Sequence, residues 1–70
     1  MNQQDFLTVL SSVRRIDGHA MLDVPIRDTT LDSLDLATLR SALEARIGHP
    51  IRDDVWSRAG TLRQILECLE

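Results

Sequence analysis

Apolar residues recur at steps of three and four along the first part of the chain. Between about Asp5 and Ile16 this spacing puts one apolar stripe on a helix, made of Phe6, Val9, Leu10, Val13 and Ile16. Asp17-Gly18 follows the stripe and favours a stop. The pattern therefore predicts an amphipathic helix over 5–16.

The periodicity is lost from Gly18 to about Leu31. Pro25 disfavours helix at the residue before it, and apolar residues mix with acidic and basic ones. Structureless connections of this length are unusual in small domains and tend to be functional. We expect a long loop that lies across the core, because it carries Met21, Leu22, Val24 and Ile26.

A second helix is predicted over 32–47, ended by Gly48 and Pro50. At about 100° per residue, one face gathers the apolar residues Leu36, Leu39, Leu43 and Ile47. Leu34 points the other way and heads a face of small residues: Ala37, Thr38, Ser41 and Ala45. Such a face lets a partner protein approach closely, with Leu34 as its anchor.

The last third of the chain predicts two shorter helices. One or two turns fit 53–58, and Gly60 breaks them. Thr61 is a good N-cap for a final helix with the stripe Leu62, Ile65, Leu66 and Leu69. No segment alternates with period two for long enough to predict a strand. The expected fold is all-α, a small four-helix bundle of three main helices and a short third helix, in one domain over 1–70.

Composition and charge exclude several functions. The net charge is −3 and only Phe6 and Trp56 are aromatic, which argues against a nucleic-acid binder. No apolar run approaches the roughly 20 residues that span a bilayer, and no signal peptide opens the chain. One cysteine and two histidines exclude an internal disulfide and the usual four-ligand zinc site. We expect a cytoplasmic monomer. Met1 just ahead of the first helix suggests a free-standing chain, and excision from a larger synthase stays open.

The sequence gives little support to catalysis. His19 and His49 do not stand beside an evident nucleophile, and 70 residues leave little material for a substrate pocket. Asp53 and Asp54 are explained by the favourable position of acids at a helix start. We therefore expect a protein that is not an enzyme.

Ser33 has two interpretations on the residues alone. In the first turn of its helix it can satisfy a backbone N–H as a cap. A hydroxyl at a helix N-terminus is also well placed to carry a phosphate, because free N–H groups and the positive dipole end stabilise a phosphodiester there. With Asp32 and Asp35 around it and Leu34 beside it, the arrangement suits a serine that is presented to other proteins.

These residues resemble the acyl carrier protein family, which includes the peptidyl carriers of nonribosomal synthesis. The core of the resemblance is Asp32-Ser33-Leu34, which matches the Asp-Ser-Leu signature at the start of that family's second helix. The resemblance continues at the family's spacings through Leu39, Ala42, Leu43, Glu44 and Ile47. Together with helix order and length, it covers nearly the whole chain.

The resemblance implies that a phosphopantetheinyl transferase, using Mg²⁺, attaches 4′-phosphopantetheine from coenzyme A to Ser33. The thiol of the arm would hold an acyl or aminoacyl group as a thioester, supplied by a loading enzyme and used by downstream synthase or tailoring enzymes. The second helix would be the partner surface. Asp32 and Asp35 would dock the transferase, Leu34 would anchor, Ala37 would lie beside the arm, and the same face includes Thr38 and Ser41.

Two departures from the family refine this interpretation. Thr29-Thr30-Leu31 replaces the Leu-Gly pair that many members carry ahead of the signature. Thr38 and Ala45 stand where acids are common in fatty-acid carriers, and Arg40 and Arg46 add positive charge. We therefore expect a carrier of polyketide or nonribosomal peptide synthesis, with acyl and aminoacyl cargo equally open. The alternative is an unmodified helical interaction module that uses the Leu34 face.

Overall fold

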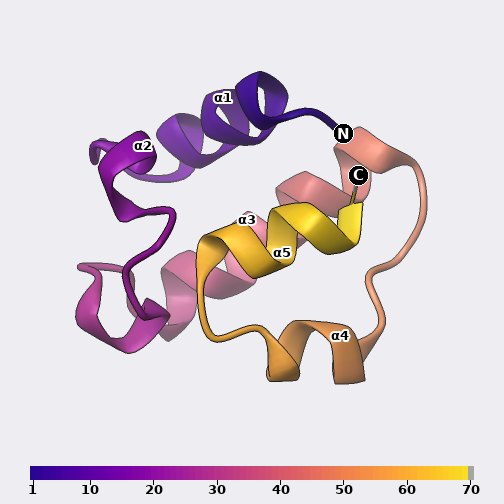
Figure 1. The fold of residues 1–70 in the computed structure, drawn as a ribbon. Helices are drawn as coiled ribbons and strands as arrows, with labels where there is room; N and C mark the ends of the chain where they lie inside the picture. Colours follow the sequence, from indigo (N-terminus) through magenta and orange to yellow (C-terminus); the bar gives the residue numbers. More distant parts are fainter. Residues whose placement is uncertain (70) are drawn as a thin grey trace.

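The computed structural model describes residues 1–69, and these form helices joined by short connections (Figure 1). Among them no strand forms, and one isolated β-bridge joins Pro25 to Thr61. The fold is therefore all-α as predicted, with three main helices and a short helix between the last two. In chain order the elements are α1 (Gln3–Val13), α2 (Gly18–Met21), the 3₁₀ turn η1 (Ile26–Asp28), α3 (Ser33–Ile47), α4 (Asp53–Arg58) and α5 (Leu62–Leu69).

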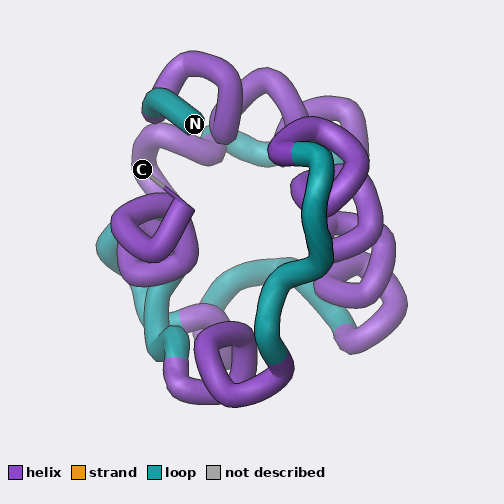
Figure 2. Tube along the Cα trace, turned by 90° about the vertical axis from the view of Figure 1, so that its right-hand side faces the viewer, coloured by secondary structure: helices purple, strands orange, loops and turns teal. Residues whose placement is uncertain are grey.

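The helices and their connections surround one apolar core, and side chains fill the space between the tubes of Figure 2. All three main helices contribute the stripes that the sequence predicts. Leu39 and Leu43 of α3 are buried, whereas Leu36 and Ile47 are half-buried and pack against the core. The whole buried set is Phe6, Val9, Leu10, Leu22, Leu31, Leu39, Leu43, Ile51, Leu62, Ile65 and Leu66.

The first helix lies closer to the N-terminus than predicted. Asn2 caps α1 by accepting a 2.8 Å hydrogen bond from the Asp5 backbone N–H, and the helix ends at Val13 instead of Ile16. Asp17 does not end α1, because its side chain caps α2 instead. Gly18 packs against α1 so closely that a Cβ atom there would lie 2.7 Å from Leu10 Cδ2. After Val13 the chain therefore leaves the helix and brings Gly18 back against Leu10.

The predicted loop over 18–31 is not structureless, because it contains α2 and η1. It does lie across the core as expected, and Leu22 and Leu31 are buried. Two backbone hydrogen bonds tie it to the start of α5, from Arg63 N to Leu22 O at 3.0 Å and from Ile26 N to Gly60 O at 2.9 Å. Neither short element spans enough residues to show a hydrophobic period.

An ion pair adds to this connection between the loop and α5. Arg63 donates from Nε and Nη2 to the two carboxylate oxygens of Asp23, at 2.5 and 3.2 Å. The hydrogen bond from Arg63 holds the pKa of the Asp23 carboxyl below its ordinary value. The segment that leads to α3 is therefore held to α5 by backbone and side-chain contacts.

The remaining boundaries agree with the sequence. Gly48 ends α3 in the left-handed conformation with φ of 84°, where a residue with a Cβ atom would be strained. The two ends of the described chain meet, because the Met1 nitrogen donates to Leu69 O at 2.8 Å (Figure 1). No helix of residues 1–69 is both long and apolar enough to cross a membrane.

A Leu22→Ala variant tests whether the first connection is part of the core. Leu22 is fully buried, so we expect the free energy of unfolding to fall by about 2–5 kcal/mol in urea titrations followed by circular dichroism. Leu34→Ala is the matched control, because Leu34 is exposed and its truncation should cost no more than about 0.5 kcal/mol. Equal effects of the two changes would contradict this packing.

Candidate functional site

The first turn of α3 is closed by two aspartates. Asp32 is the N-cap, and its Oδ1 accepts a 2.8 Å hydrogen bond from the Asp35 backbone N–H. In return, Asp35 Oδ2 accepts from the Asp32 backbone N–H at 3.3 Å. These reciprocal bonds form a capping box, which satisfies two N–H groups that the helix geometry leaves without partners. Ser33 is consequently the first helical residue and not the cap.

Ser33 is exposed, and its hydroxyl makes no hydrogen bond within the described chain. The backbone N–H groups of Ser33 and Leu34 also donate to no acceptor among residues 1–69. They lie at the positive end of a helix of 15 residues. A phosphate esterified to this hydroxyl therefore fits the site, because unused N–H donors lie next to it.

The two aspartates differ in how far they are available to a partner. Asp32 is exposed and has no ion-pair partner among the described residues. The Asp35 side chain is only 18% exposed, and its Oδ2 receives Arg14 Nη1 at 2.8 Å in addition to the Asp32 N–H. The structure thus places both acids beside Ser33 but leaves only Asp32 unpaired.

The outward face of α3 has the composition that the sequence predicts. Leu34 is 73% exposed, and no other large apolar side chain of the described residues is exposed. The small residues of this face are exposed as well: Ala37, Thr38, Ser41 and Ala45. An exposed leucine among small side chains is thereby brought next to the Ser33 hydroxyl.

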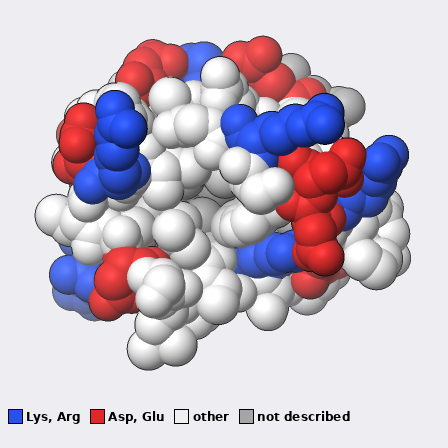
Figure 3. Space-filling model, turned by 90° about the horizontal axis from the view of Figure 1, so that it is seen from below, with Lys and Arg blue, Asp and Glu red and all other residues white. Residues whose placement is uncertain are grey.

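The charged residues within α3 are balanced by neighbours. Arg40 pairs with Glu44 at 3.6 Å and with Asp53 at 2.5 Å, and the hydrogen bond that Arg40 donates to Asp53 raises the pKa of Arg40 further above its ordinary value. Arg46 pairs with Asp5 at 3.3 Å. Basic and acidic atoms likewise lie next to each other around an uncharged, hollowed centre in Figure 3. The positive charge expected from Arg40 and Arg46 is therefore largely neutralised.

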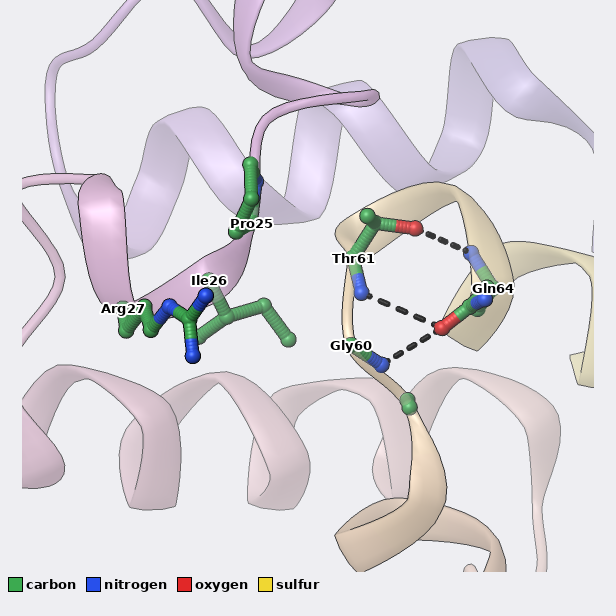
Figure 4. A pocket seen from close by; sticks show the side chains of 7 residues that line it. Pro25, Ile26, Arg27, Gly60, Thr61 and Gln64 are labelled. Atoms are coloured by element: carbon green, nitrogen blue, oxygen red, sulfur yellow. Dashed lines mark hydrogen bonds between the residues drawn. The ribbon is translucent and has the colours of Figure 1, made fainter.

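A hollow of about 470 Å³ lies between η1 and the connection from α4 to α5 (Figure 4). Its polar groups mostly bond to one another, because Gln64 Oε1 accepts from the N–H groups of Gly60 and Thr61, and Thr61 Oγ1 accepts from the Gln64 N–H. Sequence reasoning missed this hollow, since its walls come from segments far apart in the chain. Its lining residues are Pro25, Ile26, Arg27, Ala59, Gly60, Thr61 and Gln64.

The histidines and the cysteine do not join the site. His19 and His49 are exposed, and each lies within hydrogen-bond distance of a neighbour: Gln3 Nε2 for His19 and Pro50 O for His49. Cys68 is exposed on α5. Within residues 1–69 no three potential metal ligands gather into one group. The chemistry that this surface offers is that of one unbonded hydroxyl at a helix start.

Comparison with known protein families identifies the family of this chain. Residues 4–69 match the protein family described as the phosphopantetheine attachment site, and the chain therefore belongs to that family. Its members are carrier domains, non-catalytic in themselves, that bear a covalently attached 4′-phosphopantetheine. They interact with a phosphopantetheinyl transferase and with pathway enzymes. No curated protein and no solved structure matches the chain.

Unfolding measurements test whether Asp32, and not Ser33, caps α3. Because the Ser33 hydroxyl makes no hydrogen bond, Ser33→Ala should change the free energy of unfolding by no more than about 0.5 kcal/mol. Asp32→Ala removes the N-cap and should lower the free energy of unfolding by about 1 kcal/mol. Asp32→Asn keeps a hydrogen-bond acceptor and should avoid most of that decrease. Urea unfolding of the three variants makes the comparison. A loss for Ser33→Ala as large as that for Asp32→Ala would show that the serine caps the helix.

Proposed function

We propose that Ser33 is the residue that carries 4′-phosphopantetheine. The observation that supports it is the exposed, unbonded hydroxyl at the first helical position, beside two unused backbone N–H groups. In the loading step Ser33 Oγ bonds to the phosphorus next to the pantetheine of coenzyme A. The bond from that phosphorus to the bridging oxygen breaks, adenosine 3′,5′-bisphosphate leaves, and the hydroxyl proton passes to the transferase or solvent.

Each residue around Ser33 has a part in this step. The capping box between Asp32 and Asp35 fixes the first turn, so the hydroxyl is presented in a defined position without being used for the cap. The N–H groups of Ser33 and Leu34 are available to the phosphate oxygens. The bound group supplies a terminal thiol that holds acyl or aminoacyl cargo as a thioester. Tethering raises the cargo's effective concentration near each enzyme.

The partner surface is the outward face of α3. Leu34 inserts into an apolar pocket of the transferase and then of the loading, synthase or tailoring enzymes, because it is large, apolar and 73% exposed. Asp32 supplies the unpaired negative charge at this end. Ala37, Thr38 and Ser41 allow close approach because their side chains are small.

The pathway is polyketide or nonribosomal peptide synthesis. In support, the outward face of α3 carries no charged residue, and the charged side chains within α3 have ion-pair partners. Enzymes that select carriers through a basic docking patch bind such a face weakly. Enzymes that select carriers through apolar contact with Leu34 bind it more tightly.

Intact-mass measurement tests the loading of Ser33. The folded protein, incubated with coenzyme A, Mg²⁺ and a broad-specificity phosphopantetheinyl transferase, should gain the mass of one phosphopantetheine group. Ser33→Ala should gain nothing, whereas Ser11→Ala should load like the wild type, because Ser11 is exposed on α1 and lies outside the proposed partner surface. No gain in folded wild-type protein, or a gain in Ser33→Ala, would sink the proposal.

Added acidic charge on α3 tests the pathway assignment. Loaded protein with Thr38→Glu and Ala45→Glu should show a KM about two- to fivefold lower than wild type with a fatty-acid loading enzyme that has a basic docking patch. The control variant carries Ser11→Glu and Ser57→Glu, which add the same charge at exposed positions outside α3. Efficient turnover of the wild type by that enzyme, with no response to the α3 charges, would assign the chain to fatty-acid synthesis instead.

A further inference from the structure

An arginine from the end of α1 reaches the first turn of α3. Arg14 is the C-cap residue of α1, with extended backbone at φ −152° and ψ 139°. Its Nη1 lies 2.8 Å from Asp35 Oδ2, and the arginine side chain is 45% exposed against 18% for the aspartate. The pair joins residues 21 positions apart in the sequence. Arg14 therefore covers the carboxylate of an acid that stands two residues after Ser33.

This pair alters the charge that a partner meets at Ser33. Asp35 Oδ2 is engaged by Arg14 and by the Asp32 N–H, so its negative charge is both screened and partly buried. Farther along the helix, Arg40, Glu44 and Arg46 are also paired. In the described structure, Asp32 is then the one acid beside Ser33 that has no cationic partner.

We propose that Arg14 is a specificity-determining residue that acts through Asp35. Because Arg14 neutralises Asp35, the negative charge next to Ser33 is lower. Enzymes that bind the carrier through a basic surface therefore bind it more weakly. Enzymes that bind the carrier through the apolar Leu34 face alone, with no basic surface, are unaffected. This inference rests on the proposed loading of Ser33.

The neighbouring residue offers a matched control. Arg15 is also exposed at the end of α1, and it has no ion-pair partner among residues 1–69. Arg14→Ala and Arg15→Ala therefore change the net charge equally, but only the first uncovers the Asp35 carboxylate. Arg14→Lys keeps a cation at the same position.

Steady-state kinetics of loading separate the two variants. With a phosphopantetheinyl transferase that has a basic carrier-binding surface, Arg14→Ala should lower KM for the carrier about two- to fivefold at low salt, with kcat unchanged. At about 0.5 M salt the difference should disappear, because the Debye length is then only a few ångströms. Arg15→Ala should change KM less, and Arg14→Lys should behave like the wild type.

Combining Arg14→Ala or Arg15→Ala with Asp35→Asn tests whether Arg14 changes KM through the charge of Asp35. The asparagine keeps an acceptor for the Asp32 N–H but removes the charge, so Arg14→Ala should then change KM no more than Arg15→Ala does. Equal KM values for the two single variants would overturn the inference. So would a salt-independent loss of kcat with lowered thermal stability, which would mean that Arg14 only supports the fold. Failure of the wild type to load at all would instead refute the proposed function on which this inference rests.

Discussion

The reciprocal hydrogen bonds between Asp32 and Asp35 determine what Ser33 is free to do. A helix start needs an acceptor for its unmatched N–H groups, and a serine at this point can serve as one. Here the Asp32 carboxylate meets that need at 2.8 Å, so the Ser33 hydroxyl stays unbonded and exposed. The two hydrogen bonds that cap the helix therefore do not involve the Ser33 side chain.

The position of this helix start is fixed by the core and by contacts from distant parts of the chain. Leu31 is buried directly before the cap, and Leu39 and Leu43 anchor the inner face of α3. The preceding connection is held to α5 through Leu22, Ile26 and the pair of Asp23 with Arg63. A carrier that must present its arm to several enzymes benefits from an attachment point on a rigid helix end. Contacts between segments far apart in the sequence thereby hold the start of α3 in place.

Hydrophobic periodicity was enough to predict α3, α5 and the outward position of Leu34. It misplaced α1, because Asn2 caps that helix at its start and because the chain leaves the helix after Val13 and brings Gly18 back against Leu10. It could not reveal α2 or η1, which have too few residues for a helical period to recur. The roles of Asp32 and Ser33 also stayed open, because both residue types are good N-caps and they are adjacent. The pairing of Arg14 with Asp35 depends on tertiary structure and leaves no local signal.

Tertiary contacts also neutralise several of the charges that the sequence places on α3. Arg40 and Arg46 suggested a positive contribution on α3, but Glu44, Asp53 and Asp5 balance them. Asp35 also has a partner, because it pairs with Arg14 at 2.8 Å. The outward face of α3 is therefore uncharged apart from Asp32 at its end, and Leu34 is its one large apolar side chain.

The central claim is that one hydroxyl, freed by the cap beside it, carries the arm. Its most direct test is to digest the loaded wild-type protein with trypsin and locate the added phosphopantetheine by fragmentation mass spectrometry. The account predicts the group on the peptide 28–40, at Ser33, which is the only serine in that peptide. Attachment to any other residue, or a folded protein that carries no group after incubation with an active transferase, would contradict it.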